Sequence, residues 1–176
     1  MRNVRYALGL ALAVTGVVTI QALPHLERYS LARGDAVVEA PPGGTAEHAG
    51  SRWRLISLEP AQPGELAPAG TRALTAVIGV TPLSREAGKA LAKGCAAAVR
   101  DPSGRVWTSA TGSSVTPLDG VEPTCARVDK NYKAVAPKTG KEVRWQASFV
   151  VPAAAADPLR VEVRLEGALE ALRLAR

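Results

Sequence analysis

Histidine is nearly absent from the 176-residue chain, which has only His25 and His48. The composition around them predicts that both lie outside the folded domain and are exposed to solvent. Activation of a serine or cysteine nucleophile usually requires a neighbouring base, most often histidine, and histidine is also a common ligand of zinc. The sequence therefore argues against a Ser-His-Asp site, a Cys-His site and a zinc site.

Other signatures of chemistry are missing as well. The chain has no Cys-x-x-Cys pair and no glycine-rich phosphate loop after a strand. Some acidic residues could contribute to a calcium site, but they lack the ligand spacing of an EF-hand loop; they are Asp101, Asp119, Glu122, Asp129 and Asp157. We therefore expect no cofactor, no metal and no enzymatic activity, with an enzyme that has an unrecognised site as the alternative.

Aromatic residues are also scarce, at 4% of the chain, and the net charge is +6. From Ser51 onward there are 18 basic and 12 acidic side chains, an excess that attracts anionic partners. Nucleic-acid binding calls for an Arg- and Lys-rich helix or an aromatic platform for the bases. We identify neither and expect no nucleic-acid partner. The prevalence of Ala, Arg, Gly and Pro, with 16 Arg against 6 Lys, is typical of a GC-rich genome such as that of an actinobacterium.

The first part of the chain contains a long apolar run. Arg2 and Arg5 precede residues 6–23, which have no charged side chain. At a helical rise of ~1.5 Å per residue this run spans roughly 27 Å, close to a bilayer hydrocarbon core of about 30 Å. We predict that residues 6–24 form one transmembrane signal-anchor helix. By the positive-inside rule, residues 1–5 then lie in the cytoplasm and the C-terminal domain is extracellular.

A cleaved signal peptide is the alternative to a retained anchor. Ser30-Leu31-Ala32 has the small-x-small form that signal peptidase requires, although it follows the charged Glu27 and Arg28. Cleavage there would secrete the domain as a soluble binding protein. Under either interpretation the domain is exported.

Residues 25–50 are dense in Ala, Gly and Pro, with scattered charge. A segment of this composition can bury little apolar surface, so we predict a flexible extracytoplasmic linker. Val37 and Val38 are the only hint of a strand in it, and we do not assign one. Both histidines lie in this segment.

Residues 51–176 consist of short apolar runs separated by turn residues, which is the pattern of a β-domain. Strands are predicted at 52–59, 72–81, 95–100, 105–109, 142–151, 159–166 and 170–175. A short surface helix is predicted at 84–94 and a type I turn at 101–104. About seven strands predict an all-β, two-sheet antiparallel sandwich. Three tryptophans are expected to supply much of its core: Trp53, Trp107 and Trp145.

The β-domain also resembles a known family. The resemblance lies in the first strand with Trp53, the long strand 72–81, the turn at 101–104, the sequence 149–152 (FVVP) and the strand 159–165. Residues 51–176 are similar to immunoglobulin-like ectodomains of secreted or membrane-anchored actinobacterial and firmicute proteins of unknown function. The resemblance implies an immunoglobulin-like sandwich and no catalytic residues. It fails at the cysteines, which are closer in sequence here than the pair that joins the two sheets of an immunoglobulin domain.

The chain has two cysteines, Cys95 and Cys125. Two cysteines in an exported domain are more often paired than free, so we predict a disulfide that ties the strand at 95–100 to the long loop before residue 126. Closing a loop of about 30 residues stabilises a fold by roughly 3–4 kcal/mol. A redox role is not expected, because no second motif cysteine or adjacent histidine activates either thiol.

Residues 127–144 have the most unusual local composition, with two acidic and six basic residues. The basic residues are Arg127, Lys130, Lys133, Lys138, Lys141 and Arg144. One interpretation is a contact surface for an anionic partner, either a lipid or wall component or an acidic envelope protein. The alternative is a solvated loop and edge strand whose lysines prevent edge-to-edge pairing. The sequence as a whole predicts a non-enzymatic, single-pass membrane protein whose extracellular β-sandwich is a protein-interaction or cell-envelope accessory module.

Overall fold

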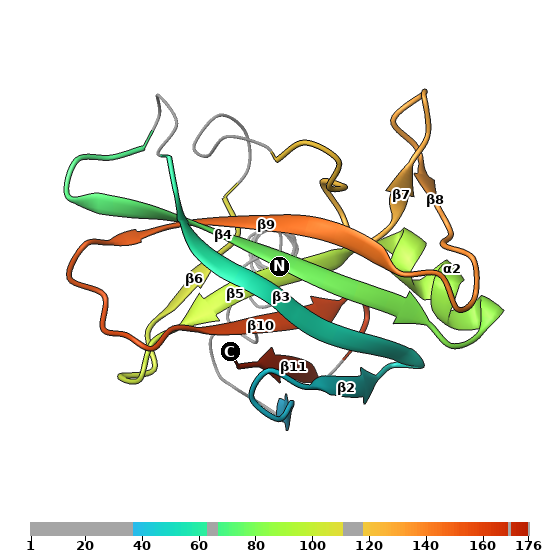
Figure 1. Cartoon of the computed structure of the whole chain (residues 1–176), viewed down its shortest axis with the longest axis horizontal. Helices are drawn as coiled ribbons and strands as arrows, with labels where there is room; N and C mark the ends of the chain where they lie inside the picture. The colour runs from blue at the N-terminus through green and yellow to red at the C-terminus, as the bar shows by residue number, and fades with distance from the viewer. Residues whose placement is uncertain (1–36, 63–66, 111–117, 169, 176) are drawn as a thin grey trace, which may run out of the picture. The chain divides into compact units, whose positions relative to one another are not determined.

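The computed structural model describes residues 37–62, 67–110, 118–168 and 170–175. In this part of the chain the secondary structure is mostly β, with eleven strands in two large sheets and one small sheet, together with one helix (Figure 1). The predicted anchor at 6–24, the residues before it and the alternative cleavage site lie outside the described residues. No helix in the described ranges is long and apolar enough to cross a membrane.

The first large sheet has five strands. In spatial order they are β1 (Val37–Glu39), β11 (Ala171–Leu174), β10 (Arg160–Leu165), β5 (Cys95–Arg100) and β6 (Val106–Thr108). Neighbouring strands are antiparallel except β1 and β11, which run parallel. In the central strand β10, Val161, Val163 and Leu165 are buried. The charged residues between them point to the opposite face, as the two-residue period of a strand requires.

The second large sheet is built from longer strands. In spatial order they are β2 (Thr45–His48), β3 (Ser51–Ala61), β4 (Thr71–Pro82) and β9 (Val143–Pro152). All three pairings are antiparallel, and the β3–β4 register shifts between Leu55 and Ser57. The inward side chains of both large sheets form one buried cluster, whose largest fully buried members include Trp53, Ile78, Phe149, Val99, Val161 and Leu172. The predicted β-sandwich is therefore confirmed.

The predicted helix and the predicted tight turn are both present. Helix α2 (Arg85–Lys93) begins after Ser84, whose hydroxyl accepts a hydrogen bond from the Ala87 N–H at 3.0 Å, as an N-cap does. The β5–β6 turn is closed by the Gly104 N–H, which donates to the Asp101 carbonyl at 3.0 Å. The tryptophans divide between core and edge. Trp53 and Trp145 are buried, whereas Trp107 is half-buried.

The predicted linker at 25–50 differs from the structure after residue 36. Its later part forms β1 and β2, which belong to the two large sheets. His48 is only 8% exposed, and its main-chain carbonyl accepts a hydrogen bond from Trp53 Nε1 at 3.1 Å. The prediction of an exposed linker histidine is therefore wrong for His48. Strands of three and four residues are too short to show an alternating pattern, and β1 pairs with the far end of the chain.

The sheet arrangement is not that of an immunoglobulin domain. The sequence predicts about seven antiparallel strands, whereas the described residues form eleven, one pair of which is parallel. The third sheet consists of β7 (Arg127–Val128) and β8 (Ala134–Val135). Strands of two residues are too short to give an apolar pattern, so the sequence does not predict this hairpin. The β-sandwich is thus confirmed, whereas the predicted immunoglobulin-like arrangement of its strands is not.

Four charged residues form a network on the outer face of the five-stranded sheet. Glu162, only 5% exposed, accepts hydrogen bonds from Arg100 Nε and Arg173 Nη2, both at 2.7 Å. Arg173 also pairs with Glu39 on β1. Burial raises the pKa of Glu162, but the hydrogen bonds from the two guanidinium groups outweigh it, so the pKa lies below its ordinary value. We call Glu39, Arg100, Glu162 and Arg173 the arginine network.

Candidate functional site

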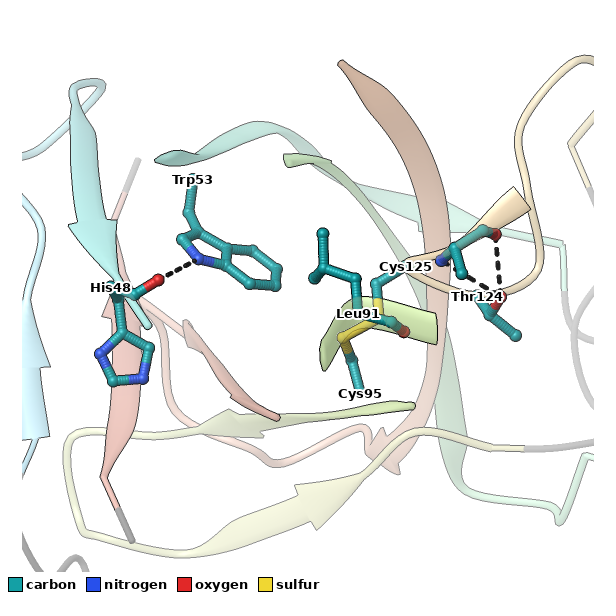
Figure 2. The surroundings of a disulfide bond; sticks show 7 residues. His48, Trp53, Leu91, Cys95, Thr124 and Cys125 are labelled. Atoms are coloured by element: carbon teal, nitrogen blue, oxygen red, sulfur yellow. Dashed lines mark hydrogen bonds between the residues drawn. A yellow bond between two sulfur atoms is a disulfide. The ribbon is translucent and has the colours of Figure 1, made fainter. Parts of the chain in front are cut away.

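A disulfide links helix α2 to the β7–β8 hairpin. Cys95 is the first residue of β5, directly after α2, and Cys125 lies just before β7. The two are bonded, with their Cα atoms 6.0 Å apart, which confirms the predicted pair. Cys125 is fully buried, and Figure 2 shows the side chain of Leu91 from α2 beside the sulfur atoms. The disulfide therefore joins the start of β5, just after α2, to the start of the hairpin rather than one large sheet to the other.

The tip of the β7–β8 hairpin is fixed by Asp129. Its carboxylate Oδ1 accepts hydrogen bonds from the main-chain N–H groups of Asn131 at 2.8 Å and Lys133 at 2.9 Å. The turn places Tyr132 at a φ of 59°, in the left-handed region, with 91% of its surface exposed. The negative charge of Asp129 is thus directed at the backbone, as in an Asx turn. The exposed side chains at the tip are those of Lys130, Asn131, Tyr132 and Lys133.

Helix α2 presents a second group of basic side chains. Its buried face consists of Ala87, Gly88 and Leu91. The residues at spacings of four on its other side are Arg85, Lys89 and Lys93, and all three are exposed, because positions four apart share one helix face. The i, i+4, i+8 spacing was visible in the sequence, but our prediction considered only the segment 127–144.

Helix α2 packs closely against the segment that follows the hairpin. A Cβ atom on Gly88 would lie 2.6 Å from the Pro137 carbonyl oxygen, so only glycine permits this approach. The Gly140 N–H donates to the carbonyl of Pro82, just before α2, at 2.9 Å. The loop that carries Lys138 and Lys141 is thus held against the beginning of the helix. In Figure 1 the hairpin stands apart from the large sheets, beside α2.

All lysines of the protein belong to these segments. They are Lys89, Lys93, Lys130, Lys133, Lys138 and Lys141, and every one is exposed. Among the described residues, no lysine has a carboxylate within 4.0 Å, and every ion pair found there uses an arginine. We call this surface of six lysines the lysine end.

The two arginines of the predicted basic segment behave differently from its four lysines. Arg127 Nε lies 3.9 Å from a carboxylate oxygen of Glu122, and Arg144 Nε lies 3.1 Å from one of Glu142. Glu142 also accepts from Arg54 Nε at 2.8 Å, and this hydrogen bond holds the pKa of Glu142 below its usual value. The structure therefore divides the predicted set of six into four lysines without a carboxylate partner and two arginines that have one.

Neither a metal-binding cluster nor the arginine-lined cavity is a better candidate site among the described residues. In the described ranges, no three His, Cys, Asp or Glu residues lie close enough together to hold a metal. A cavity of about 400 Å³ is lined by arginines 100, 160 and 173. Their charges are already offset there, because Glu162 pairs with Arg100 and Arg173, and Glu39 lies 3.7 Å from Arg160. The lysine end is accordingly the better candidate for an anionic ligand.

No protein-family model matches the chain, and no curated protein matches it. Among solved structures, it is similar to an uncharacterized β-sandwich protein from Clostridium difficile 630, with 7% sequence identity and a TM-score of 0.46 over 80% of this chain and 94% of that one. It is also similar to a "putative lipoprotein" from Bacillus subtilis subsp. subtilis str. 168, with 8% identity and a TM-score of 0.48 over 77% of this chain and 38% of that one. Neither likeness assigns a family or an activity.

Proposed function

We propose that this chain is a non-enzymatic, membrane-anchored extracytoplasmic module whose lysine end binds an anionic component of the cell envelope. The observation that carries the proposal is the set of six exposed lysines without a carboxylate partner in the described part of the chain. The disulfide between Cys95 and Cys125 supports an extracytoplasmic location, because disulfides form and persist in oxidising compartments.

The arrangement of the lysine end suits electrostatic binding. Solvated charges attract an oppositely charged surface over a Debye length of about 10 Å at 0.1 M salt. Lysines in ion pairs with carboxylates would attract such a surface less strongly. Here the carboxylate of Asp129 binds backbone N–H groups, and that of Glu142 binds arginine. Protection of an edge strand does not account for the lysines on α2, since a helix has no strand edge.

The binding role is tested with a photoreactive amino acid in place of Tyr132. This probe is placed in the natural chain and in a variant with Lys130, Lys133, Lys138 and Lys141 changed to Gln, and crosslinked in intact cells. We expect the crosslinked envelope component to be lost in the Gln variant and kept in the matched Lys→Arg variant, which retains the charge. Equal crosslinking by the natural chain and the Gln variant would show that the lysine end is not a binding surface.

The membrane location is tested separately. A reporter enzyme that is active only outside the cytoplasm is fused after residue 36, before β1. We expect an active reporter in the membrane fraction and a mature chain that still contains residues 6–24. A reporter active only inside the cell would overturn the orientation. A chain starting after Ala32 would show that the domain is secreted as a soluble binding protein.

A further inference from the structure

We propose that the lysine end docks on the anionic phospholipid headgroups of the membrane that residues 6–24 are predicted to span. The inference rests on the proposed function and names lipid as the anionic component. It assigns the sandwich one orientation, in which helix α2 and the β7–β8 hairpin face the bilayer. Three features of the molecule support this: where the chain enters the sandwich, how short the tether is, and which side chains the lysine end exposes.

The chain enters the five-stranded sheet at the end to which helix α2 is connected. Val37, the first residue of β1, is aligned with Ala171, the first residue of β11. Because β11 runs antiparallel to β10, the start of β11 lies beside the end of β10, where Leu165 is aligned with Cys95. Cys95 begins β5 and follows Lys93 by two positions. The preceding segment therefore joins the five-stranded sheet at the end where helix α2 leads into it.

The tether between the predicted anchor and β1 is short. Residues 25–36 separate the predicted anchor from Val37, and even fully extended these twelve residues span only about 40 Å. Docking is then an intramolecular event with a high effective concentration. Each lysine near an anionic bilayer contributes roughly a fivefold factor in binding, so a few lysines suffice to shift the equilibrium toward the docked state.

The exposed side chains of the lysine end suit contact with a bilayer surface better than the binding of a polymer in a groove. The lysines lie on a helix, a hairpin tip and a loop, and the hairpin projects from the body of the sandwich (Figure 1). Tyr132, at the tip between Lys130 and Lys133, is 91% exposed, and Val135 nearby is 45% exposed. Tyrosine is enriched at the headgroup level of membranes, where its ring meets the acyl boundary and its hydroxyl stays in water. A projecting tip with lysines around one tyrosine matches that boundary.

Amine labelling tests the orientation directly, because every lysine of the chain lies in the lysine end. The full-length chain is placed in nanodiscs of phosphatidylcholine, or of phosphatidylcholine with roughly one-third phosphatidylglycerol, neither of which contains an amine. Acetylation rates are measured by mass spectrometry against an added single-lysine peptide. We expect the six lysines to react several-fold more slowly in the anionic discs and to recover at about 1 M salt. Equal rates in the two lipids overturn the inference.

Matched variants then separate lysine binding from general charge. Docking is measured as energy transfer from the tryptophans of the protein to a dansyl-labelled lipid. The Lys130→Gln/Lys133→Gln variant is expected to weaken docking roughly 25-fold. The Arg105→Gln/Arg160→Gln variant changes the net charge equally at the opposite end of β5 and β10, and is expected to dock like the natural chain. An equal loss in both variants contradicts a specific orientation.

The two proposals can fail separately. If lipid charge has no effect in nanodiscs but the Tyr132 probe still crosslinks an envelope component in a lysine-dependent manner, the partner is a protein or wall polymer and only the lipid inference is wrong. If neither assay depends on the lysines, the proposed function is wrong as well.

Discussion

The arginine network and the lysine end use positive charge in opposite ways. In the arginine network, Glu162 is almost fully buried, and both Arg100 and Arg173 donate to its carboxylate. At the lysine end, the six ammonium groups are exposed and lack a carboxylate partner among the described residues. The planar guanidinium group matches a carboxylate with several donors, whereas an ammonium group is a strongly hydrated point charge. The comparison indicates that the arginines hold the sandwich together and the lysines remain available to a partner.

Removal of the disulfide between Cys95 and Cys125 should have the largest effect on the stability of the fold. Changing Cys95 and Cys125 to Ala is expected to lower the free energy of unfolding by roughly 3–4 kcal/mol, since a loop of about 30 residues is released in the unfolded chain. Urea denaturation measures the loss. The natural chain with its disulfide reduced serves as the control and should show a similar loss. A variant as stable as the oxidised chain would mean that the clamp between α2 and the hairpin is dispensable.

The second-largest loss of stability is expected when the central carboxylate of the arginine network is removed. Glu162→Gln leaves Arg100 without its counter-charge and Arg173 with Glu39 alone, which is expected to cost about 2–3 kcal/mol. Glu47→Gln is the matched control, because Glu47 pairs with Arg52 on the exposed surface at 3.1 Å, where a pair contributes up to about 1 kcal/mol. Urea midpoints of the two variants give the comparison. Equal losses would remove the distinction between a buried network and an ordinary surface pair.

Acid should remove the stabilisation that the arginine-bound carboxylates give to the fold. Burial raises the pKa of Asp101, but hydrogen bonds from Ser103 and Arg105 prevail and lower it from 3.8 to about 2. A carboxyl group whose pKa is lower in the folded state stabilises the fold above its unfolded pKa, and this contribution is lost as the pH falls through the folded value. We expect the melting temperature of the natural chain to fall between about pH 4 and pH 2 more steeply than that of Asp101→Asn. Parallel curves would show that Asp101 does not contribute in this way.

The regular elements could be predicted because their signals are local. Helix α2 begins after a capping Ser84, and in β9 every second residue is buried while those between are more accessible. The short strands β1 and β2 were missed because three and four residues are too few to show an alternating pattern, and β1 also pairs with the far end of the chain. The lysine end was found only in part. Sequence showed the basic segment 127–144, but the packing of Gly88 against Pro137 and the disulfide bring the helix lysines to it.

The distinction between paired arginines and free lysines also depends on tertiary structure. Arg144 and Lys141 are three positions apart and look equivalent in the sequence. Glu142, between them, is held by Arg54 from β3, so that its charge serves the arginines and not the lysine. Such an assignment requires knowing that β3 and β9 lie on the two sides of β4 in one sheet, which a single sequence does not provide.

The smallest change in stability is expected when the lysines are neutralised, and it tests most sharply whether they differ from the arginine network. Changing Lys130, Lys133, Lys138 and Lys141 to Gln is expected to alter the free energy of unfolding by no more than about 0.5 kcal/mol, as for surface substitutions that break no contact. A slight gain is favoured, because neutralisation relieves repulsion among like charges on a chain of net charge +6. Thermal and urea unfolding of the variant at low salt measure the change. A loss above about 1 kcal/mol would assign the lysines to the scaffold, whereas an unchanged fold that no longer binds its anionic partner would leave binding as their function.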